Sequence, residues 1–196
     1  EEAAEPDAEE EPEEEAEPTV EEEEPEAAVE EEEPEVTPVV VPAEALVDVA
    51  EAGLAETEAA IRAAGGLCAS FRCDVADDVS VKAAVDGAVA HFGRIDAAFN
   101  AAGIDGEAGK MTAEQSLENW HRVIGIDLTG IFHCLRHQIP AMLASGGGAI
   151  VNCASSAGVR GAAYCGAYSA AKHGVVGLTK TAALEYGSQG VRINAV

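Results

Sequence analysis

Basic residues are scarce in this sequence, which has 11 Lys and Arg against 37 Asp and Glu and a formal net charge of −26. Nucleic-acid-binding proteins present basic clusters to the phosphates, and no basic stripe occurs here. The sequence also lacks a run of about 20 apolar residues, the length that a membrane-spanning helix needs. These absences argue against binding to DNA or RNA and against a membrane span.

Targeting signals and cysteine pairs are missing as well. The first residues have neither the basic-then-apolar order of a secretory signal nor the Arg-rich character of a transit peptide. The five cysteines form no C-x-x-C pair, and most of them lie in apolar runs. This pattern favours reduced, buried thiols over disulfides or a metal site, and we therefore expect a cytoplasmic protein. Because the first residue is Glu and not Met, we also expect a fragment of a longer protein.

The charge is distributed very unevenly along the chain. Residues 1–40 hold 21 acidic residues and six of the eight prolines, but no basic and no aromatic residue. Such a segment cannot bury enough apolar surface to offset the conformational entropy that ordering would cost. We predict that residues 1–43 form an acidic, Glu/Pro-rich disordered segment. Residues 44–196 have the length and apolar content of one ordinary domain.

In the second part of the chain, short apolar runs alternate with segments of helical periodicity. Strands are predicted at 45–49, 67–73, 95–99, 149–153 and 191–196, and the two longest helices at 113–136 and 164–187. Thr112 and Gln115 have the spacing of a capping box for the first long helix. Strands that are apolar on both faces and alternate with helices are typical of a parallel sheet covered on both sides.

Polar or small residues follow the predicted strands, where ligands bind in such sheets. These residues are Asp48, Asp74, Asn100–Gly103 and Ser155–Ser156. Tyr168 and Lys172 form a further pair, because a four-residue spacing puts both side chains on one face of a helix. A tyrosine hydroxyl, with an ordinary pKa near ~10, becomes a workable general acid/base only when a nearby cation stabilises its phenolate. The spacing alone is equally typical of two ordinary surface residues.

The combination of motifs resembles the short-chain dehydrogenase/reductase family. The matching segments are Cys73–Val75, Asn100–Gly103, Ile150–Asn152 with Ser155, Tyr168–Gly174 and Arg192–Val196. The resemblance covers residues 45–196 and implies a Rossmann-type, doubly wound parallel sheet that is truncated at both ends.

The resemblance also implies a reaction, in which hydride passes between a nicotinamide and a secondary alcohol or ketone. Tyr168 would then be the proton donor and acceptor, Lys172 would lower the pKa of its hydroxyl and contact the nicotinamide ribose, and Ser155 would orient the substrate. The implied cofactor-binding residues are Asp48, Asp74, Val75, Asn100, Ala101, Gly103, Tyr168 and Lys172. No metal is implied. His133 and His137 are four residues apart but lack a third ligand, so we interpret them as surface residues.

Asp48 bears on the choice of cofactor. A carboxylate at this strand end accepts hydrogen bonds from the adenosine ribose hydroxyls and repels a 2′-phosphate, so NAD is favoured over NADP. The alternative is an ordinary solvated acid. The resemblance further makes the two long helices the usual subunit-packing helices, which implies a homodimer or homotetramer in the full-length form. The alternative is that some apolar residues of these helices face the sheet and belong to the core, which would explain part of the same pattern.

Asp127 departs from the family, which usually has Asn at this position. Between Ile124 and Ile131 it would place a lone charge at the edge of an apolar helix face, which is energetically costly. We therefore hypothesise that Asp127 pairs with Lys172, draws the lysine charge away from Tyr168 and belongs to the catalytic set. The alternative is a solvated carboxylate whose backbone carbonyl alone has a role.

A second departure is larger. Members of this family begin with a strand followed by T-G-x-x-x-G-x-G, whose glycines let the backbone approach the pyrophosphate. The motif does not occur in this sequence, and its strand would belong between those predicted at 45–49 and 95–99. Val39–Val41 is a poor substitute because prolines flank it.

Two interpretations fit this absence. In the first, the sequence is a partial or misjoined reading of an ordinary dehydrogenase. In the second, it is a non-catalytic relative whose acidic segment recruits a basic partner, so that salt would abolish the interaction. We favour the first, because Ser155, Tyr168 and Lys172 are present together.

Overall fold

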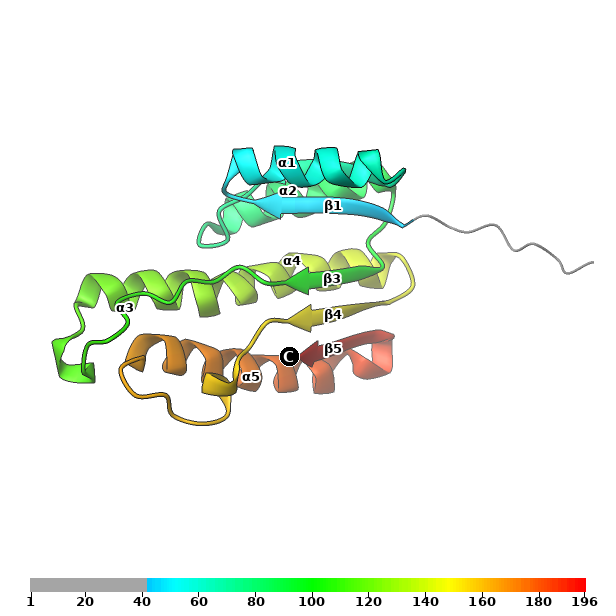
Figure 1. Cartoon of the computed structure of the whole chain (residues 1–196). Coiled ribbons are helices and arrows are strands. Elements are labelled where there is room, and N and C mark those ends of the chain that lie inside the picture. Colours follow the sequence, from blue (N-terminus) through cyan, green and yellow to red (C-terminus); the bar gives the residue numbers. More distant parts are fainter. Residues whose placement is uncertain (1–41) are drawn as a thin grey trace, which may run out of the picture. The chain divides into compact units, whose positions relative to one another are not determined.

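The computed structural model describes residues 42–196, in which strands alternate with helices (Figure 1). The strands are β1 (Ala43–Asp48), β2 (Leu67–Arg72), β3 (Ala97–Asn100), β4 (Gly148–Asn152) and β5 (Val191–Ala195). The helices are α1 (Glu51–Ala63), α2 (Asp78–Phe92), α3 (Leu117–Val123), α4 (Gly130–Ala144) and α5 (Gly166–Tyr186). All five predicted strands overlap observed ones, and the α/β class is confirmed. The predicted disordered segment lies almost wholly outside the described residues and stays a prediction.

The strands form two parallel sheets where we expected one. β1 pairs with β2, and β3, β4 and β5 pair in that order. Within residues 42–196, β1 and β3 do not pair with each other, and the side chains of Val47 on β1 and Phe99 on β3 are exposed. The gap between β1 and β3 lies where the family's glycine-rich strand was expected. Without that strand between them, β1 and β3 belong to separate sheets.

The main apolar core joins the three-stranded sheet to α4 and α5. Its fully buried members include Ile131 and Met142 of α4, Ile150 of β4, Val175 of α5 and Val191 of β5. The long helix α5 thereby lies against β5, and its N-terminal turns extend past the carboxyl ends of the strands. The fold brings these turns to the edge of the sheet where ligands bind in α/β proteins.

A second, smaller cluster connects the two-stranded sheet to α4 through α2. Cys73, Val81, Ala84 and Cys134 are buried together there. Burial raises the pKa of the Cys134 thiol to about 12 and also raises the pKa of Cys73. All five cysteines are free and three are buried, as the sequence predicted. Because a raised pKa keeps a thiol protonated, neither Cys73 nor Cys134 is suited to nucleophilic chemistry.

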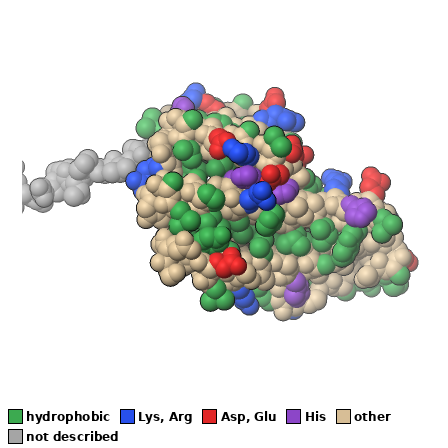
Figure 2. Space-filling view, turned by 180° about the vertical axis from the view of Figure 1, so that it is seen from behind, with side chains coloured by type: hydrophobic (Ala, Val, Ile, Leu, Met, Phe, Trp, Pro, Cys, Tyr) green, Lys and Arg blue, Asp and Glu red, His purple; other side chains and the backbone are tan. Residues whose placement is uncertain are grey.

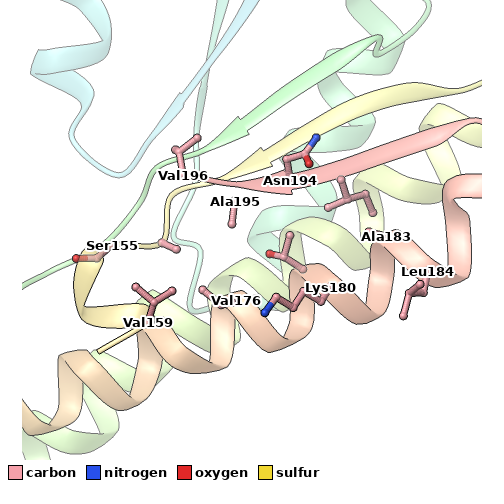
Figure 3. A pocket seen from close by; sticks show the side chains of 12 residues that line it. Ser155, Val159, Val176, Lys180, Ala183, Leu184, Asn194, Ala195 and Val196 are labelled. Carbon is pink, nitrogen blue, oxygen red and sulfur yellow. The ribbon is translucent and has the colours of Figure 1, made fainter. Parts of the chain in front are cut away.

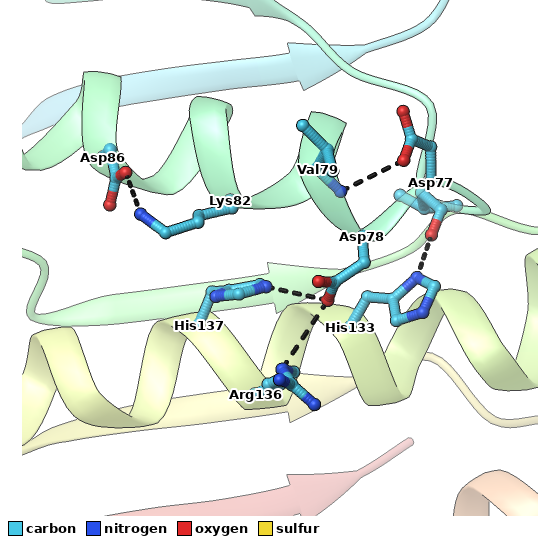
Figure 4. A network of polar contacts seen from close by, with 9 residues as sticks. Asp77, Asp78, Val79, Lys82, Asp86, His133, Arg136 and His137 are labelled. Atoms are coloured by element: carbon cyan, nitrogen blue, oxygen red, sulfur yellow. Dashed lines mark hydrogen bonds and ion pairs between the residues drawn. The ribbon is translucent and has the colours of Figure 1, made fainter.

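Polar contacts reinforce the packing of α2 on α4 (Figure 4). His137 Nε2 lies 2.8 Å from Asp78 Oδ1, and His133 Nδ1 lies 3.0 Å from the carbonyl oxygen of Val75. The hydrogen bond from His137 holds the pKa of Asp78 below its ordinary value. Histidine, acidic and basic side chains gather together on this helical face (Figure 2). Both histidines are half-buried on the outside of α4, and the fold gives them polar partners in and just before α2 that the sequence did not reveal.

The first long helix is broken where the sequence predicted one continuous element. A 3-10 turn covers Thr112–Glu114, α3 begins after Ser116, and a π-helical turn at Ile124–Thr129 leads into α4. The capping prediction for Thr112 was wrong, since the Ser116 hydroxyl accepts the N–H of Asn119, and Gln115 instead accepts the N–H of Ala167. In the described part of the chain, no helix combines the length and the apolar character that crossing a membrane takes.

Candidate active site

Tyr168 and Lys172 lie on successive turns at the start of α5. The Lys172 side chain is 3% exposed and its Nζ lies 5.4 Å from the centroid of the Tyr168 ring, while Tyr168 itself is half-buried. The predicted sharing of one helix face is therefore confirmed. A lysine this deeply buried is not an ordinary surface residue, because burying a charge without partners is energetically costly.

The ammonium group of Lys172 has two partners inside the protein. Its Nζ donates a hydrogen bond of 3.0 Å to the carbonyl oxygen of Cys153, just beyond the end of β4. Asp127 Oδ2 lies 3.4 Å from the same nitrogen. The lysine is thus held between a strand end and the π-helical turn, two elements that are far apart in the sequence.

Asp127 is completely buried, which excludes the alternative of a solvated carboxylate. Its Oδ1 accepts the N–H of Ile104 at 2.9 Å, whereas Oδ2 has no hydrogen bond in the described residues. Burial raises the pKa of the Asp127 carboxyl, and the Ile104 amide and the Lys172 charge oppose that rise. The predicted pairing with Lys172 is present, and the same carboxylate also holds the loop that follows β3.

Two glycines lie at this close packing. A Cβ atom at Gly174 would come within 2.7 Å of the end of the Leu128 side chain, so the glycine lets this side chain of the π-helical turn lie against α5. A Cβ atom at Gly103 would come within 3.0 Å of Asp127 Oδ2 and 3.3 Å of Lys172 Nζ. Gly103 therefore lies directly against the ion pair.

Ser155 follows β4 and is half-buried. Its Oγ accepts the N–H of Ala157 at 3.1 Å, which leaves the hydroxyl proton available for donation. Ser155 also lines a cavity of about 680 Å³ between α5 and β5, together with Val176, Lys180 and Val196 (Figure 3). Neither Tyr168 nor Lys172 lines this cavity, so we do not assign it to a substrate that reacts at Tyr168.

The predicted adenosine-binding acids lie at strand ends on the other sheet. Asp48 Oδ1 accepts the N–H of Ala50 at 2.8 Å, and Asp74 Oδ1 accepts the N–H of Ala76 at 2.9 Å. Both residues are exposed, and each keeps a second carboxylate oxygen free of hydrogen bonds to residues 42–196. The Val75 side chain packs against Gly130 at the start of α4. These acids remain candidates for binding a ribose or an adenine.

Asn100 plays a structural part that the sequence did not reveal. Its Nδ2 donates to Gln138 Oε1 and to Asn152 Oδ1, both at 2.9 Å, and its Oδ1 accepts from Gln138 at 2.8 Å. Asn152 in turn donates to Thr179 at 2.9 Å. Because this buried network occupies the Asn100 amide, a cofactor contact at this position would use the backbone. The sequence held one sign of this network, because the apolar run of β4 ends in a polar residue, Asn152.

A buried lysine beside a tyrosine lies at the strand ends of a Rossmann-like α/β fold, the place where ligands bind in this class of protein. Residues 43–196 match the family model described as "Enoyl-(Acyl carrier protein) reductase". The chain belongs to the short-chain dehydrogenase/reductase family. The resemblance noted in the sequence is thereby confirmed.

Two curated relatives of this chain are dehydrogenases that act on six-membered rings by name. The cyclohexanol dehydrogenase of Acinetobacter sp. (strain SE19) is 51% identical over 136 residues, which cover 69% of this chain and 54% of the relative. The 2,5-dichloro-2,5-cyclohexadiene-1,4-diol dehydrogenase of Sphingobium indicum (strain UT26) is 49% identical over 140 residues, which cover 71% and 56%. The chain thus spans about half the length of these relatives.

Solved structures agree with the fold. NAD⁺-bound xylitol dehydrogenase matches with a TM-score of 0.76 and 38% identity, over 78% of this chain and 58% of that one. A variant of actinorhodin polyketide ketoreductase with NADPH matches with a TM-score of 0.73 and 37% identity, over 77% and 58%. Both forms of the nicotinamide cofactor therefore occur among the neighbours.

Proposed function

We propose that the protein represented by this chain is an NAD-dependent oxidoreductase that interconverts a cyclic secondary alcohol and its ketone. The observation that carries this proposal is the buried Lys172 ammonium, 5.4 Å from the Tyr168 ring centroid at the carboxyl ends of the strands. The names of the two relatives, a cyclohexanol dehydrogenase and a cyclohexadiene-diol dehydrogenase, support a six-membered ring as the substrate class.

The proton steps are assigned to side chains of this chain. Tyr168 takes the proton of the alcohol hydroxyl as the carbonyl forms and returns it in the reverse direction. Lys172 stabilises the phenolate, because an opposite charge nearby favours the ionised form. Ser155, whose hydroxyl proton is free, donates a hydrogen bond to the substrate oxygen. When bound, the nicotinamide supplies or accepts the hydride.

The residues fit a nicotinamide dinucleotide at its two ends. Asp48 and Asp74 present free carboxylate oxygens suited to ribose and adenine hydrogen bonds, and Val75 lies beside Asp74. Ala101 and Gly103 offer an exposed backbone after β3, close to Lys172. The glycine-rich motif that would hold the pyrophosphate does not occur in this sequence. We therefore expect the nicotinamide dinucleotide to bind tightly only when that motif is added to the chain.

The test is a chimera in which the strand–T-G-x-x-x-G-x-G–helix segment of the cyclohexanol dehydrogenase replaces residues 1–42 and the C-terminal segment of that enzyme follows Val196. We expect the chimera to reduce NAD⁺ in the presence of cyclohexanol, measured as absorbance at 340 nm. A chimera with the three motif glycines changed to valine is the control and should be inactive, since side chains would block the pyrophosphate. A folded chimera that binds NADH but oxidises no secondary alcohol would overturn the proposal.

Asp48 provides a separate prediction about cofactor choice. In the chimera, Asp48→Ser should narrow the preference for NADH over NADPH by about tenfold to a hundredfold, because a negative charge no longer repels the 2′-phosphate. Dissociation constants from nicotinamide fluorescence measure the effect. Glu44→Gln, which removes an exposed acid from the other end of the same strand, is the control and should leave the ratio unchanged. If the ratio of the NADH and NADPH dissociation constants were the same in Asp48→Ser and in the parent chimera, Asp48 would not select the cofactor. Its role would then be limited to its hydrogen bond with the N–H of Ala50.

We also propose that the full-length protein is a homodimer or homotetramer that packs through α4 and α5. Some small residues of these helices are already used inside the chain. Ala171 is fully buried and Gly174 packs on Leu128 within the chain, so these residues are used internally. Phe132 of α4 and Leu184 of α5 remain exposed, as does Trp120 on the neighbouring α3, and these side chains would supply the apolar contact. Apolar side chains lie between the charged groups on this helical face (Figure 2).

A further inference from the structure

The two oxygens of the Asp127 carboxylate have different environments. Oδ1 is bound by the Ile104 amide at 2.9 Å, which fixes the carboxylate to the loop after β3. Oδ2 is buried, has no hydrogen bond to residues 42–196 and lies 3.4 Å from Lys172 Nζ. A buried carboxylate oxygen without a donor is rare, because leaving it unsatisfied is costly. The Lys172 charge is therefore the main compensation for Oδ2.

The groups that face this carboxylate come from every element packed around it. α5 contributes Lys172 and, beyond it, Tyr168. The loop after β3 contributes the exposed acid Asp105, whose charge adds to the rise in the Asp127 pKa, and the end of β4 contributes the carbonyl of Cys153. Lys172 is the one cation in this described set. Its charge is consequently shared between Asp127 on one side and the Tyr168 ring on the other.

We propose that Asp127 is a positioning residue that holds the Lys172 ammonium against the Cys153 carbonyl and offsets its charge at Tyr168, so that the phenol ionises at a higher pH than with a neutral residue at position 127. This inference rests on the proposed function, which gives Tyr168 and Lys172 their roles. The physical reason is the sign of the charge. A fixed anion beside the lysine cancels part of the potential that stabilises the phenolate.

The reaction direction follows from the same charge balance. A phenol that ionises at higher pH stays protonated over a wider pH range, and a protonated phenol is the form that donates a proton to a ketone. A neutral residue at position 127 should therefore move the change-over between carbonyl reduction and alcohol oxidation to lower pH.

The experiment is an ultraviolet titration of the full chain, which requires neither cofactor nor turnover. Tyrosinate absorbance at 295 nm is read within milliseconds of a pH jump, before the folded chain can open. The chain has three tyrosines, and subtraction of the Tyr168→Phe titration isolates the signal of Tyr168. In Asp127→Asn the midpoint of that signal should fall by about one pH unit, the size expected for a nearby charge.

Two further variants make the result specific. Asp105→Asn removes an exposed acid from the same region and should move the midpoint far less, because water screens its charge. Lys172→Met should move the midpoint upward, since the cation that stabilises the phenolate is gone. An unchanged or raised midpoint in Asp127→Asn, with Lys172→Met behaving as expected, would overturn the role of Asp127. An unchanged midpoint in Lys172→Met would instead contradict the Tyr168–Lys172 pair of the proposed function.

Discussion

Replacing Tyr168 with phenylalanine should lower alcohol oxidation by the chimera about 10²-fold to 10⁴-fold, the range over which a positioned acid/base contributes to a rate. The change removes one oxygen atom and keeps the aromatic ring near Lys172 Nζ. The packing of α5 should therefore survive, and the loss should appear in kcat with little change in the affinity for NADH. The measurement is the initial rate of NAD⁺ reduction with cyclohexanol between pH 7 and 10.

The matched control for this variant is Tyr164→Phe. Tyr164 lies four residues earlier and is 56% exposed, so its hydroxyl has contact with water and no expected part in the proton transfer. Its replacement should leave the rate within about twofold, since surface changes have small effects. Undiminished turnover in Tyr168→Phe would remove the basis of the proposed mechanism, because no other ionisable hydroxyl of the described site has Lys172 beside it.

Replacing Asn152 with alanine should lower the melting temperature by about 5–15 °C. Asn152 is fully buried and links Asn100 on β3 to Thr179 on α5. Its removal takes one hydrogen-bond partner from each of two buried polar side chains, Asn100 and Thr179, at a cost of about 1–3 kcal/mol each. One kcal/mol corresponds to roughly 2–4 °C in a domain of this size. Thermal unfolding followed by circular dichroism measures the effect in the chain as it stands.

Asn194→Ala is the control for the stability prediction. Asn194 lies on the neighbouring strand β5 and is exposed, so its change should shift the melting temperature by no more than about 2 °C. Asn100→Ala should resemble Asn152→Ala, because both remove a member of one buried network. Melting temperatures of the Asn152 and Asn194 variants that agree with the parent would mean that the network contributes nothing to stability.

Some parts of the site were accessible from the sequence because they depend on short-range geometry. The spacing of Tyr168 and Lys172 puts both residues on one face of any α-helix, whatever surrounds it. The pairing of Asp127 with Lys172 was also predicted, since a carboxylate on an apolar face needs a nearby cation. N-capping is likewise local, and Asp77 accepts the N–H of Val79 at the start of α2.

Other parts depended on which elements meet in space. Thr112 and Ser116 have equally good capping chemistry, but in the structure Ser116 caps α3, and Gln115 binds the N–H of Ala167 at the start of the distant α5. The histidines of α4 gained partners because α2 packs beside them. Helix periodicity contains no information about which other helix will lie alongside.

By itself, the amino-acid sequence determined the α/β class, the family and the candidates for the reacting side chains. Periodicity, strand-end polarity and motif order depend only on the order and spacing of residues along the chain. Only the tertiary structure decided the division into two sheets, the buried network around Asn100 and the contact of Asp127 with both Ile104 and Lys172. The physical reason is that these features depend on distances between residues far apart in the chain. Such distances arise only when the apolar faces of α4 and α5 pack on the strands.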